Sequence, residues 1–324
     1  MRKLTIGMAT YNDYDGVYFT IQSLRMYHSE VMDDVEFVII NNSPDEKYHK
    51  ALQGLSKHIK QPIKYVQFTD YNSTSVKNLI FEHANTPYVL AIDCHVLLEA
   101  GSIKKLIEFY DSSKDQGNLL QGPLLHDDLN TVSTSFNDKW GTGMQGQWQK
   151  DDKYVTPDSE PFEIFAQGCG MFSCRKDSWL KYHKNFRGFG GEEVYIHTKY
   201  RQAGKKTICL PFARWTHRFT RVNGVPYPNK WIDRYRNYII GRLELGLDYD
   251  DVDVEFKDYV PEEQRTEIKK EVAKLFIFEQ NPFLKQTVVT TVAPQFIHIK
   301  GTDLYYPLSS MEVVTPRGNC GCGK

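Results

Sequence analysis

Residues 87–98 read Pro-Tyr-Val-Leu-Ala-Ile-Asp-Cys-His-Val-Leu-Leu, and this stretch decides the fold that the sequence predicts. The uninterrupted apolar run from Tyr88 to Ile92 is typical of a strand buried on both faces, as in a parallel sheet. Asp93 and His95 follow at its carboxyl end, where open α/β sheets bind ligands. Side chains two positions apart on an extended chain point the same way, so this carboxylate and this imidazole could hold one divalent ion such as Mn²⁺. The alternative is a strand that simply ends in a polar turn.

The composition is that of an ordinary globular protein. Of 324 residues, 40% are hydrophobic and 25% are charged, which allows one large α/β domain with an appendage, or two modest domains. The formal net charge of -1 gives no whole-chain argument for binding nucleic acid or a membrane. No run approaches the roughly 20 apolar residues that span a bilayer, so no membrane span is expected. The six cysteines show no framework spacing, which favours free thiols and a cytoplasmic location.

Strand and helix patterns alternate through the first third of the chain. The predicted strands are 4–9, 35–40, 63–68 and 88–93, and the predicted helices are 16–28, 48–59, 73–84 and 102–110. Four consecutive strand–helix units of this kind predict a parallel, doubly wound sheet.

The rest of the chain is less regular. Residues 121–163 have little periodicity, which predicts surface loops or an irregular sheet, with a mobile flap over a substrate as the alternative. The elements expected further along are helices at 231–245 and 261–278 and β structure at 288–299. We therefore expect an α/β domain over residues 1–221 and a mainly helical C-terminal extension over residues 222–324.

Polar residues follow three strands of the predicted sheet, at 10–13, 41–45 and 93–95. These strand ends should converge, because parallel strands end at the same edge, and a nucleotide should lie there. The chain has no Gly-x-Gly-x-x-Gly after its first strand and no Gly-Lys-Ser/Thr loop, which argues against a dinucleotide site and against a P-loop. A nucleotide pyrophosphate would therefore need a divalent ion, which Asp93 and His95 could hold.

Several short motifs within residues 4–220 together resemble the GT-A glycosyltransferases, family 2 in particular. In chain order these motifs are Ala9-Thr10-Tyr11-Asn12, Asn41-Asn42-Ser43, Lys77-Asn78 and Asp93-Cys94-His95. The features similar to the polypeptide N-acetylgalactosaminyltransferases are the Asp-x-His form of the last motif, the 168–173 segment, Gly190-Gly191-Glu192-Glu193 and His217-Arg218. The resemblance implies a GT-A fold, which is a Rossmann-like nucleotide-diphospho-sugar transferase fold.

The same resemblance implies a nucleotide and metal site. Asp93, His95 and His217 would ligate Mn²⁺, or Mg²⁺ in its place. Thr10 and Tyr11 would contact the uracil or the ribose. The residues expected to bind the nucleotide are Thr10, Tyr11, Asn12, Asn41, Lys77, Asp93 and Arg218.

Three positions depart from the family pattern. Asn41 stands where the family usually has a nucleoside-binding Asp. Lys77 replaces the usual Arg, which keeps the charge but loses the bidentate fork. Tyr195 falls where the N-acetylgalactosaminyltransferases carry another Glu, so the resemblance does not fix the donor sugar.

The implied function is that of a metal-dependent glycosyltransferase, which moves a sugar from a nucleotide-sugar donor, expected to be a UDP-sugar, to an acceptor hydroxyl. Glu192 and Glu193 are the candidate catalytic residues. In an inverting enzyme Glu193, or Glu192, would be the general base on the acceptor, whereas in a retaining enzyme both would bind donor hydroxyls. The N-acetylgalactosaminyltransferase-like features favour retention. The alternative is that these two glutamates only complement the dipole of the helix that they open.

The acceptor stays open among a glycan, a protein and a nucleic-acid base. Six cationic residues could form a solvated face, a pyrophosphate clamp or a site for a polyanionic acceptor. These residues are Arg214, Arg218, Arg221, Lys230, Arg234 and Arg236. A catalytically inactive sugar-nucleotide-binding protein on the same fold is the other alternative, against which the intact Asp93, His95 and His217 argue.

Overall fold

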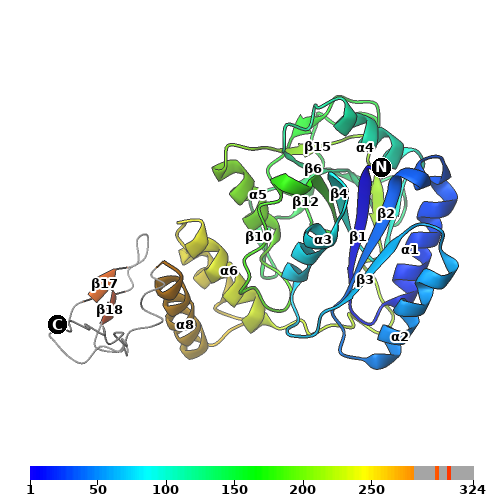
Figure 1. Cartoon of the computed structure of the whole chain (residues 1–324). Coiled ribbons are helices and arrows are strands. Elements are labelled where there is room, and N and C mark those ends of the chain that lie inside the picture. Colours follow the sequence, from blue (N-terminus) through cyan, green and yellow to red (C-terminus); the bar gives the residue numbers. More distant parts are fainter. Residues whose placement is uncertain (281–295, 299–304, 308–324) are drawn as a thin grey trace, which may run out of the picture.

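The computed structural model describes residues 1–280, 296–298 and 305–307 of the chain. The described residues form an α/β fold around an eight-stranded sheet (Figure 1). The strand order across this sheet is β13-β15-β6-β14-β4-β1-β2-β3. The α/β class that the sequence predicts is confirmed.

The first four strands form the parallel half of the sheet. They are β1 (Leu4–Thr10), β2 (Val35–Asn41), β3 (Ile63–Gln67) and β4 (Tyr88–Asp93). β1 lies between β4 and β2 and is parallel to both, and β3 is parallel to β2 at the edge. All four strands therefore end at the same edge of the sheet, as the sequence predicts.

The other half of the sheet is mixed, which the sequence pattern does not predict. β14 (Met171–Arg175) is antiparallel to β4. The strands beyond it are β6 (Leu119–Gln121), β15 (Thr207–Cys209) and β13 (Phe162–Glu163). The chain enters β14 at the edge where β4 ends, since the Asp93 N–H donates to the Gly170 carbonyl at 2.8 Å. Antiparallel strands are common on otherwise parallel sheets of this kind.

Four helices follow these strands, and the first two of them begin at an aspartate cap. They are α1 (Tyr14–Tyr27), α2 (Glu46–Leu55), α3 (Asn78–His83) and α4 (Ser102–Asp111). Asp13 accepts a hydrogen bond from the Gly16 N–H at 3.0 Å, and Asp45 accepts one from the Lys47 N–H at 2.9 Å. Each cap satisfies a backbone donor that the first helical turn leaves open. The helices predicted over this part of the chain are confirmed, and a 3₁₀ turn precedes α3.

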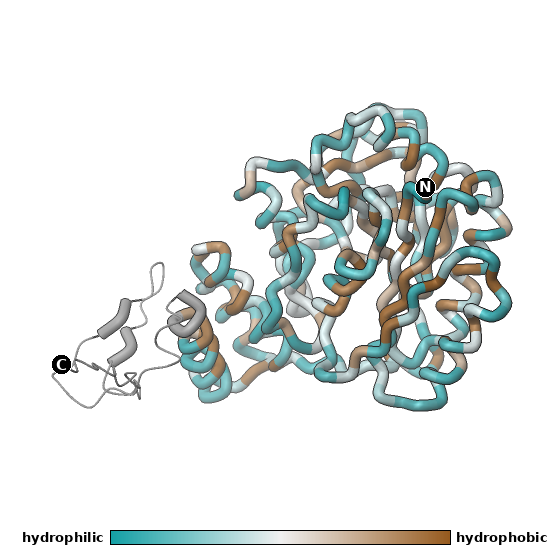
Figure 2. The backbone as a smooth tube through the Cα atoms, in the orientation of Figure 1, coloured by the Kyte–Doolittle hydropathy of each residue, from teal (hydrophilic) through white to brown (hydrophobic). Residues whose placement is uncertain are grey.

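Apolar side chains pack on both faces of the sheet, and Figure 2 shows hydrophobic residues along its central strands. Ile6 and Phe37 pack with residues of α1, α2 and α4 on one face. Val38 and Val89 pack on the other face with residues of α3, α5 (Glu193–Gln202), α6 (Trp231–Glu244) and α8 (Glu262–Gln280). Burial on both faces explains why these strands are continuous apolar runs in the sequence.

The helices after residue 222 belong to this second face. Tyr235 of α6, Phe256 of α7 (Asp250–Phe256) and Val272 of α8 lie in the same apolar cluster as Phe172 of β14. The two expected C-terminal helices are confirmed, whereas the domain boundary at residue 222 stays a prediction. Of the β structure expected at 288–299, residues 296–298 form β17 (Phe296–His298), which pairs with β18 (Tyr305–Pro307), and the remainder lies outside the described residues. Within the described ranges, no helix combines the length and the apolar run that a bilayer crossing requires.

Residues 121–163 form the irregular β structure that the sequence predicts. Its strands are β7 (Leu124–Leu125), β8 (Val132–Ser133), β9 (Ser135–Phe136), β10 (Trp140–Gly141), β11 (Met144–Gln145) and β12 (Trp148–Gln149). A small second sheet joins β7 and β8 to β16 (Trp215–His217) and β5 (Val96–Leu98). This sheet brings residues far apart in the sequence to the end of β4.

Candidate active site

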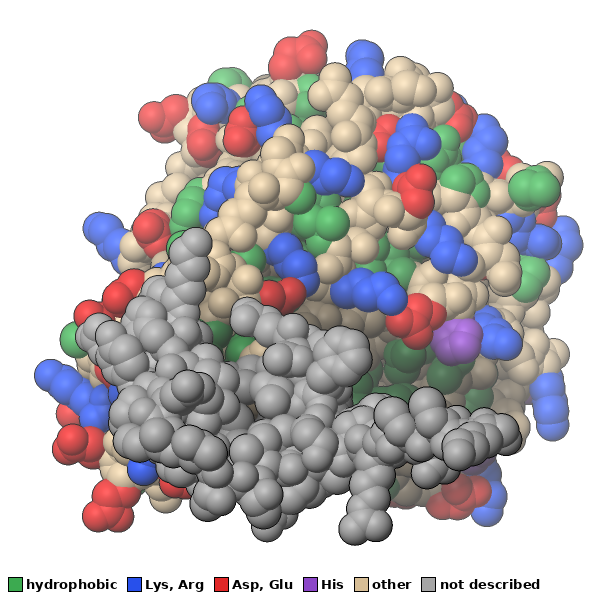
Figure 3. All heavy atoms as spheres, turned by 60° about the vertical axis from the view of Figure 1, so that its left-hand side comes forward, with side chains coloured by type: hydrophobic (Ala, Val, Ile, Leu, Met, Phe, Trp, Pro, Cys, Tyr) green, Lys and Arg blue, Asp and Glu red, His purple; other side chains and the backbone are tan. Residues whose placement is uncertain are grey.

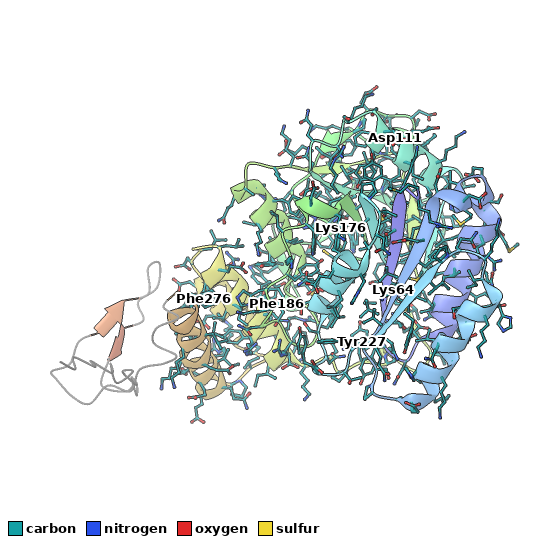
Figure 4. All side chains as sticks on the ribbon, in the orientation of Figure 1. Lys64, Asp111, Lys176, Phe186, Tyr227 and Phe276 are labelled. Atoms are coloured by element: carbon teal, nitrogen blue, oxygen red, sulfur yellow. The ribbon has the colours of Figure 1, made fainter. Side chains whose placement is uncertain are left out.

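A cavity of about 370 Å³ opens at the carboxyl ends of β1 and β4. Tyr227 lines it, and Figure 4 places this residue at the opposite end of the sheet from Asp111. Most of the residues that the sequence singles out line the same cavity. They are Thr10, Tyr11, Lys77, Asp93, His95, Glu192, Glu193 and His217.

Asp93, His95 and His217 converge at the end of β4. The Nε2 atoms of the two histidines lie 3.0 Å apart, and Nε2 of His217 lies 3.3 Å from Oδ2 of Asp93. The convergence has a local cause: β5 follows β4 after two residues and pairs antiparallel with β16, which sets His217 opposite Val96. The sequence predicts all three side chains as partners, and the fold brings them together.

This cluster fits a divalent metal ion. One ligand atom from each of Asp93, His95 and His217 lies within 4.8 Å of the other two. Two ligands at right angles on an octahedral ion, each about 2.1 Å from it, are about 3 Å apart. The separations of 3.0 and 3.3 Å in the cluster match that spacing. Two imidazole nitrogens and a carboxylate oxygen are also a donor set that suits Mn²⁺.

Lys77 anchors the other oxygen of Asp93. Its Nζ lies 2.8 Å from Oδ1 of Asp93 and donates to the Cys169 carbonyl at 2.7 Å, and the lysine is buried. Burial opposes ionisation of Asp93, yet the charge of Lys77 and the hydrogen bond from His217 hold the pKa of this carboxyl below its usual range. Asp93 is therefore a carboxylate, the form in which it can bind a cation.

His95 is held on both sides of its ring. Nδ1 lies 3.0 Å from Oδ2 of Asp13, and Nε2 lies 2.7 Å from Nη2 of Arg221. Burial lowers the pKa of His95, which favours the neutral imidazole that a metal requires. The sequence indicated Arg221 only as one of six cationic residues that could form a pyrophosphate clamp, and it did not indicate Asp13 as a site residue. Asp13 carried a weak signal, since it lies among the polar residues after the first strand.

Glu192 and Glu193 lie at the start of α5, after a turn of two glycines. Gly190 and Gly191 have φ values of 96° and 91°, which residues with a side chain rarely adopt. Both glutamates are buried, and Oε2 of each has no hydrogen-bond partner. Burial and the neighbouring charge of Glu193 raise the pKa of Glu192 to about 8, and burial raises the pKa of Glu193.

Asn237 of α6 holds the glycine turn in place. Its Oδ1 accepts from the Arg187 N–H at 2.9 Å, and its Nδ2 donates to the carbonyls of Arg187 at 2.7 Å and Gly190 at 2.9 Å. A side chain at Gly190 would collide with Arg234, because its Cβ would lie 2.6 Å from Nε of that arginine. The two glutamates are thus positioned by α6, which no sequence motif indicated.

Three of the predicted nucleotide-binding residues do not line the cavity. Asn41 is completely buried, and its amide donates to the Tyr65 hydroxyl and accepts from the Ser43 N–H, while Asn42 lines the cavity in its place. Asn12, at a φ of 52°, bonds the Ser43 hydroxyl.

Arg218 is the third of these residues. It points to Asp13, with Nη2 2.7 Å from Oδ2 of that carboxylate.

Aromatic residues complete the cavity wall. They are Phe136, Trp148, Phe189, Trp215, Phe219 and Tyr227. Phe136, Met144 and Trp148 come from the irregular segment 121–163, so this segment borders the site. That it is a mobile flap over a substrate stays a prediction.

Comparisons with known proteins bear on the family and the fold. A family model described as glycosyl transferase family 2 matches residues 5–179. A crystal structure of GalNAc-T7 with UDP, GalNAc and Mn²⁺ is similar over 87% of this chain and 57% of that chain, with a TM-score of 0.63 and 14% sequence identity. The mannosyltransferase PcManGT from Pyrobaculum calidifontis, in complex with GDP-Man and Mn²⁺, is similar over 87% of this chain and 76% of that chain, with a TM-score of 0.50 and 12% identity. This chain therefore spans less than two thirds of the GalNAc-T7 chain. No curated protein matches the sequence.

Proposed function

The chain belongs to glycosyl transferase family 2 and has the GT-A fold, and from this premise we propose that it transfers a sugar from a UDP-sugar to an acceptor hydroxyl with the help of a divalent metal ion such as Mn²⁺. Membership of the family makes the protein a glycosyltransferase. The observation that carries the proposal is the convergence of Asp93, His95 and His217 in a cavity that Thr10 and Tyr11 also line.

Asp93, His95 and His217 would hold the metal ion. When bound, such an ion neutralises charge on the leaving diphosphate. Lys77 keeps Asp93 ionised and fixes one of its oxygens, so the other oxygen stays directed at His217. The solved structures of GalNAc-T7 and PcManGT both contain Mn²⁺, which supports this assignment.

Thr10 and Tyr11 would contact the nucleoside, since they lie at the carboxyl end of β1 within the cavity. Asn42 is better placed than Asn41 for a contact at the end of β2, because only Asn42 lines the cavity. UDP is the proposed nucleotide by resemblance to GalNAc-T7, whose structure holds UDP, whereas PcManGT holds GDP-Man. The nucleotide is therefore the first point to measure.

Glu192 and Glu193 would contact the donor sugar, and we favour a retaining reaction. Each glutamate has one buried carboxylate oxygen without a partner, and both line the cavity. A donor or acceptor hydroxyl would satisfy these oxygens. Burial and the neighbouring Glu193 raise the pKa of Glu192 to about 8, and a carboxyl group that keeps its proton can donate a hydrogen bond to a sugar hydroxyl.

A nucleic-acid acceptor gains no support from the cationic cluster. Arg214, Arg218 and Arg236 are each paired with a carboxylate, of Glu99, Asp13 and Glu271 respectively. On the face shown in Figure 3, Lys and Arg side chains are interspersed with Asp and Glu side chains and do not form one basic patch.

Calorimetric titration tests the donor site. We expect UDP to bind the full chain, to bind more tightly when Mn²⁺ is present, and to bind more weakly to Tyr11→Ala. Tyr27→Ala is a matched control, because Tyr27 is exposed on α1 and does not line the cavity. The assignment is wrong if GDP binds far more tightly than UDP. It is also wrong if neither Mn²⁺ nor the Tyr11→Ala substitution changes the affinity for UDP.

A further inference from the structure

We infer that Asp13 is a positioning residue for the metal site, because it fixes the ring orientation and the tautomer of His95 so that Nε2 faces His217 and Asp93. The inference rests on the proposed function in one respect, namely that this cluster binds a metal ion. It adds a residue from β1–α1 to a site that the sequence motifs placed entirely on later segments.

The contacts of His95 determine its tautomer. Oδ2 of Asp13 lies 3.0 Å from Nδ1, and the two side chains are only 11% and 10% exposed. A carboxylate can only accept, so Nδ1 carries the proton and Nε2 has the lone pair. Nη2 of Arg221 lies 2.7 Å from Nε2 and 3.4 Å from Nδ1, so it sits against the ring and does not distinguish the two nitrogens; the assignment rests on Asp13. The lone pair of His95 is therefore on the nitrogen that faces His217.

The carboxylate of Asp13 is itself held at several points. Oδ1 accepts from the Gly16 N–H at 3.0 Å and so caps α1. Oδ2 also accepts from Nη2 of Arg218 at 2.7 Å. Because α1 is packed on the sheet through buried apolar residues, this cap ties the orientation of His95 to a rigid element. A carboxylate that orients a metal-binding histidine through its second nitrogen usually strengthens metal binding.

The other histidine has no such support. Nδ1 of His217 is buried without a hydrogen-bond partner, and the ring packs against Phe219 with their centroids 4.3 Å apart. Removal of the Asp13 charge should thus disturb one of the three ligands and leave His217 and Asp93 as they are. The expected result is weaker metal binding, not its loss.

Asp13, Cys94 and His95 could alternatively form a metal group of their own. Their ligand atoms also lie within 4.8 Å of one another. In that arrangement the ion would bind Nδ1 of His95, and Cys94 would be a ligand. Cys94→Ser separates the two arrangements, because Asp13 as a positioning residue does not require the thiol.

The test compares Asp13→Asn with the wild type in the full chain. Asparagine can still cap α1, so folding should be kept, but its single oxygen cannot serve both the Gly16 N–H and Nδ1 of His95. Asp15→Asn is the matched control, since Asp15 is an exposed residue of the same helix turn. Electron paramagnetic resonance of free Mn²⁺ should show roughly 10- to 100-fold weaker binding to Asp13→Asn and near wild-type binding to Asp15→Asn and Cys94→Ser.

A second readout needs no metal. The ¹⁵N chemical shifts of His95 in the metal-free protein should report the Nδ1-protonated tautomer in the wild type and a mixture in Asp13→Asn. Unchanged shifts and unchanged Mn²⁺ affinity in Asp13→Asn would overturn the inference, as would an equal loss of affinity in Cys94→Ser. A wild type that shows the Nδ1-protonated tautomer but binds no Mn²⁺ would instead refute the metal site of the proposed function.

Discussion

Glu192 and Glu193 are buried next to each other at the start of α5, and the raised pKa of both carboxyl groups follows from that burial. Two adjacent buried charges oppose one another, so the pair is expected to retain a proton at neutral pH. A protonated carboxyl can donate a hydrogen bond to a sugar hydroxyl, whereas a general base must be ionised. At the residue scale, this favours a role in holding the donor sugar.

Glu192→Gln should stabilise the metal-free protein at alkaline pH. The folded pKa of Glu192, about 8, lies above its ordinary value of 4.5. Its contribution to stability is therefore fully present below about pH 4.5 and is lost as the pH rises through about 8. Glutamine does not titrate, so the Tm of Glu192→Gln minus that of the wild type should grow from about pH 5 to about pH 9.

Thermal unfolding over this pH range measures that difference. Glu160→Gln is the control, because Glu160 is exposed and its replacement should give a nearly constant difference in Tm. A constant difference for Glu192→Gln as well would show that Glu192 ionises freely in the folded protein.

The sequence predicts the metal cluster better than its surroundings. Asp93 and His95 share a strand end, and the resemblance adds His217, so residue types and spacing suffice for these three. The sequence did not predict that Asn41 points away from the cavity or that Asp13 contacts His95. Which side chain of a strand end enters the cavity depends on the turn that follows, and Asn12 turns the chain through a φ of 52° just before Asp13.

At the scale of elements, the four parallel strands and their helices could be predicted from the sequence, because each strand is a continuous apolar run between polar turns. β14 is different. The direction in which a strand pairs depends on where the chain enters the sheet, which the local pattern of residues does not contain. The role of α6 could not be predicted from local sequence patterns either, because Asn237 supports the Gly190–Gly191 turn through contacts between residues far apart in the sequence.

Asn237→Leu should destabilise the protein and reduce turnover. Leucine has a similar size but leaves the Arg187 N–H and the carbonyls of Arg187 and Gly190 without partners in a fully buried place. Unpaired buried groups cost about 1–3 kcal/mol each, so a loss of about 3 kcal/mol or more is expected. Urea unfolding measures this loss, with Gln53→Leu on the exposed face of α2 as the control.

Turnover separates a positioning role for Asn237 from a merely stabilising one. Asn237→Asp keeps the acceptor for the Arg187 N–H but loses both donated hydrogen bonds, including the one to Gly190. We expect its UDP affinity to stay near the wild-type value while sugar transfer falls, because Thr10 and Tyr11 are untouched. Equal turnover in folded Asn237→Asp would show that the turn does not depend on this side chain.

At the scale of the whole molecule, the C-terminal helices support the site directly. Asp251 of α7 accepts from Nε1 of Trp140 at 3.0 Å, and Glu255 accepts from the Gly143 N–H at 2.7 Å. These contacts hold the β10–β11 hairpin, and Met144 of that hairpin lines the cavity. Helix α7 is therefore part of the architecture around the proposed donor and acceptor site.

The most direct measurement is turnover of a panel of nucleotide sugars by the full chain, followed by mass spectrometry of the products. We predict that a UDP-sugar is consumed in the presence of Mn²⁺, that EDTA stops the reaction, and that added Mn²⁺ restores it. Asp93→Ala should lose more than roughly 100-fold of this activity, because it removes a metal ligand. Asp111→Ala should keep the wild-type activity, because Asp111 is exposed and lies at the opposite end of the sheet (Figure 4). Full turnover in excess EDTA, or consumption of another nucleotide sugar in preference to every UDP-sugar, would contradict a metal-dependent UDP-sugar transferase.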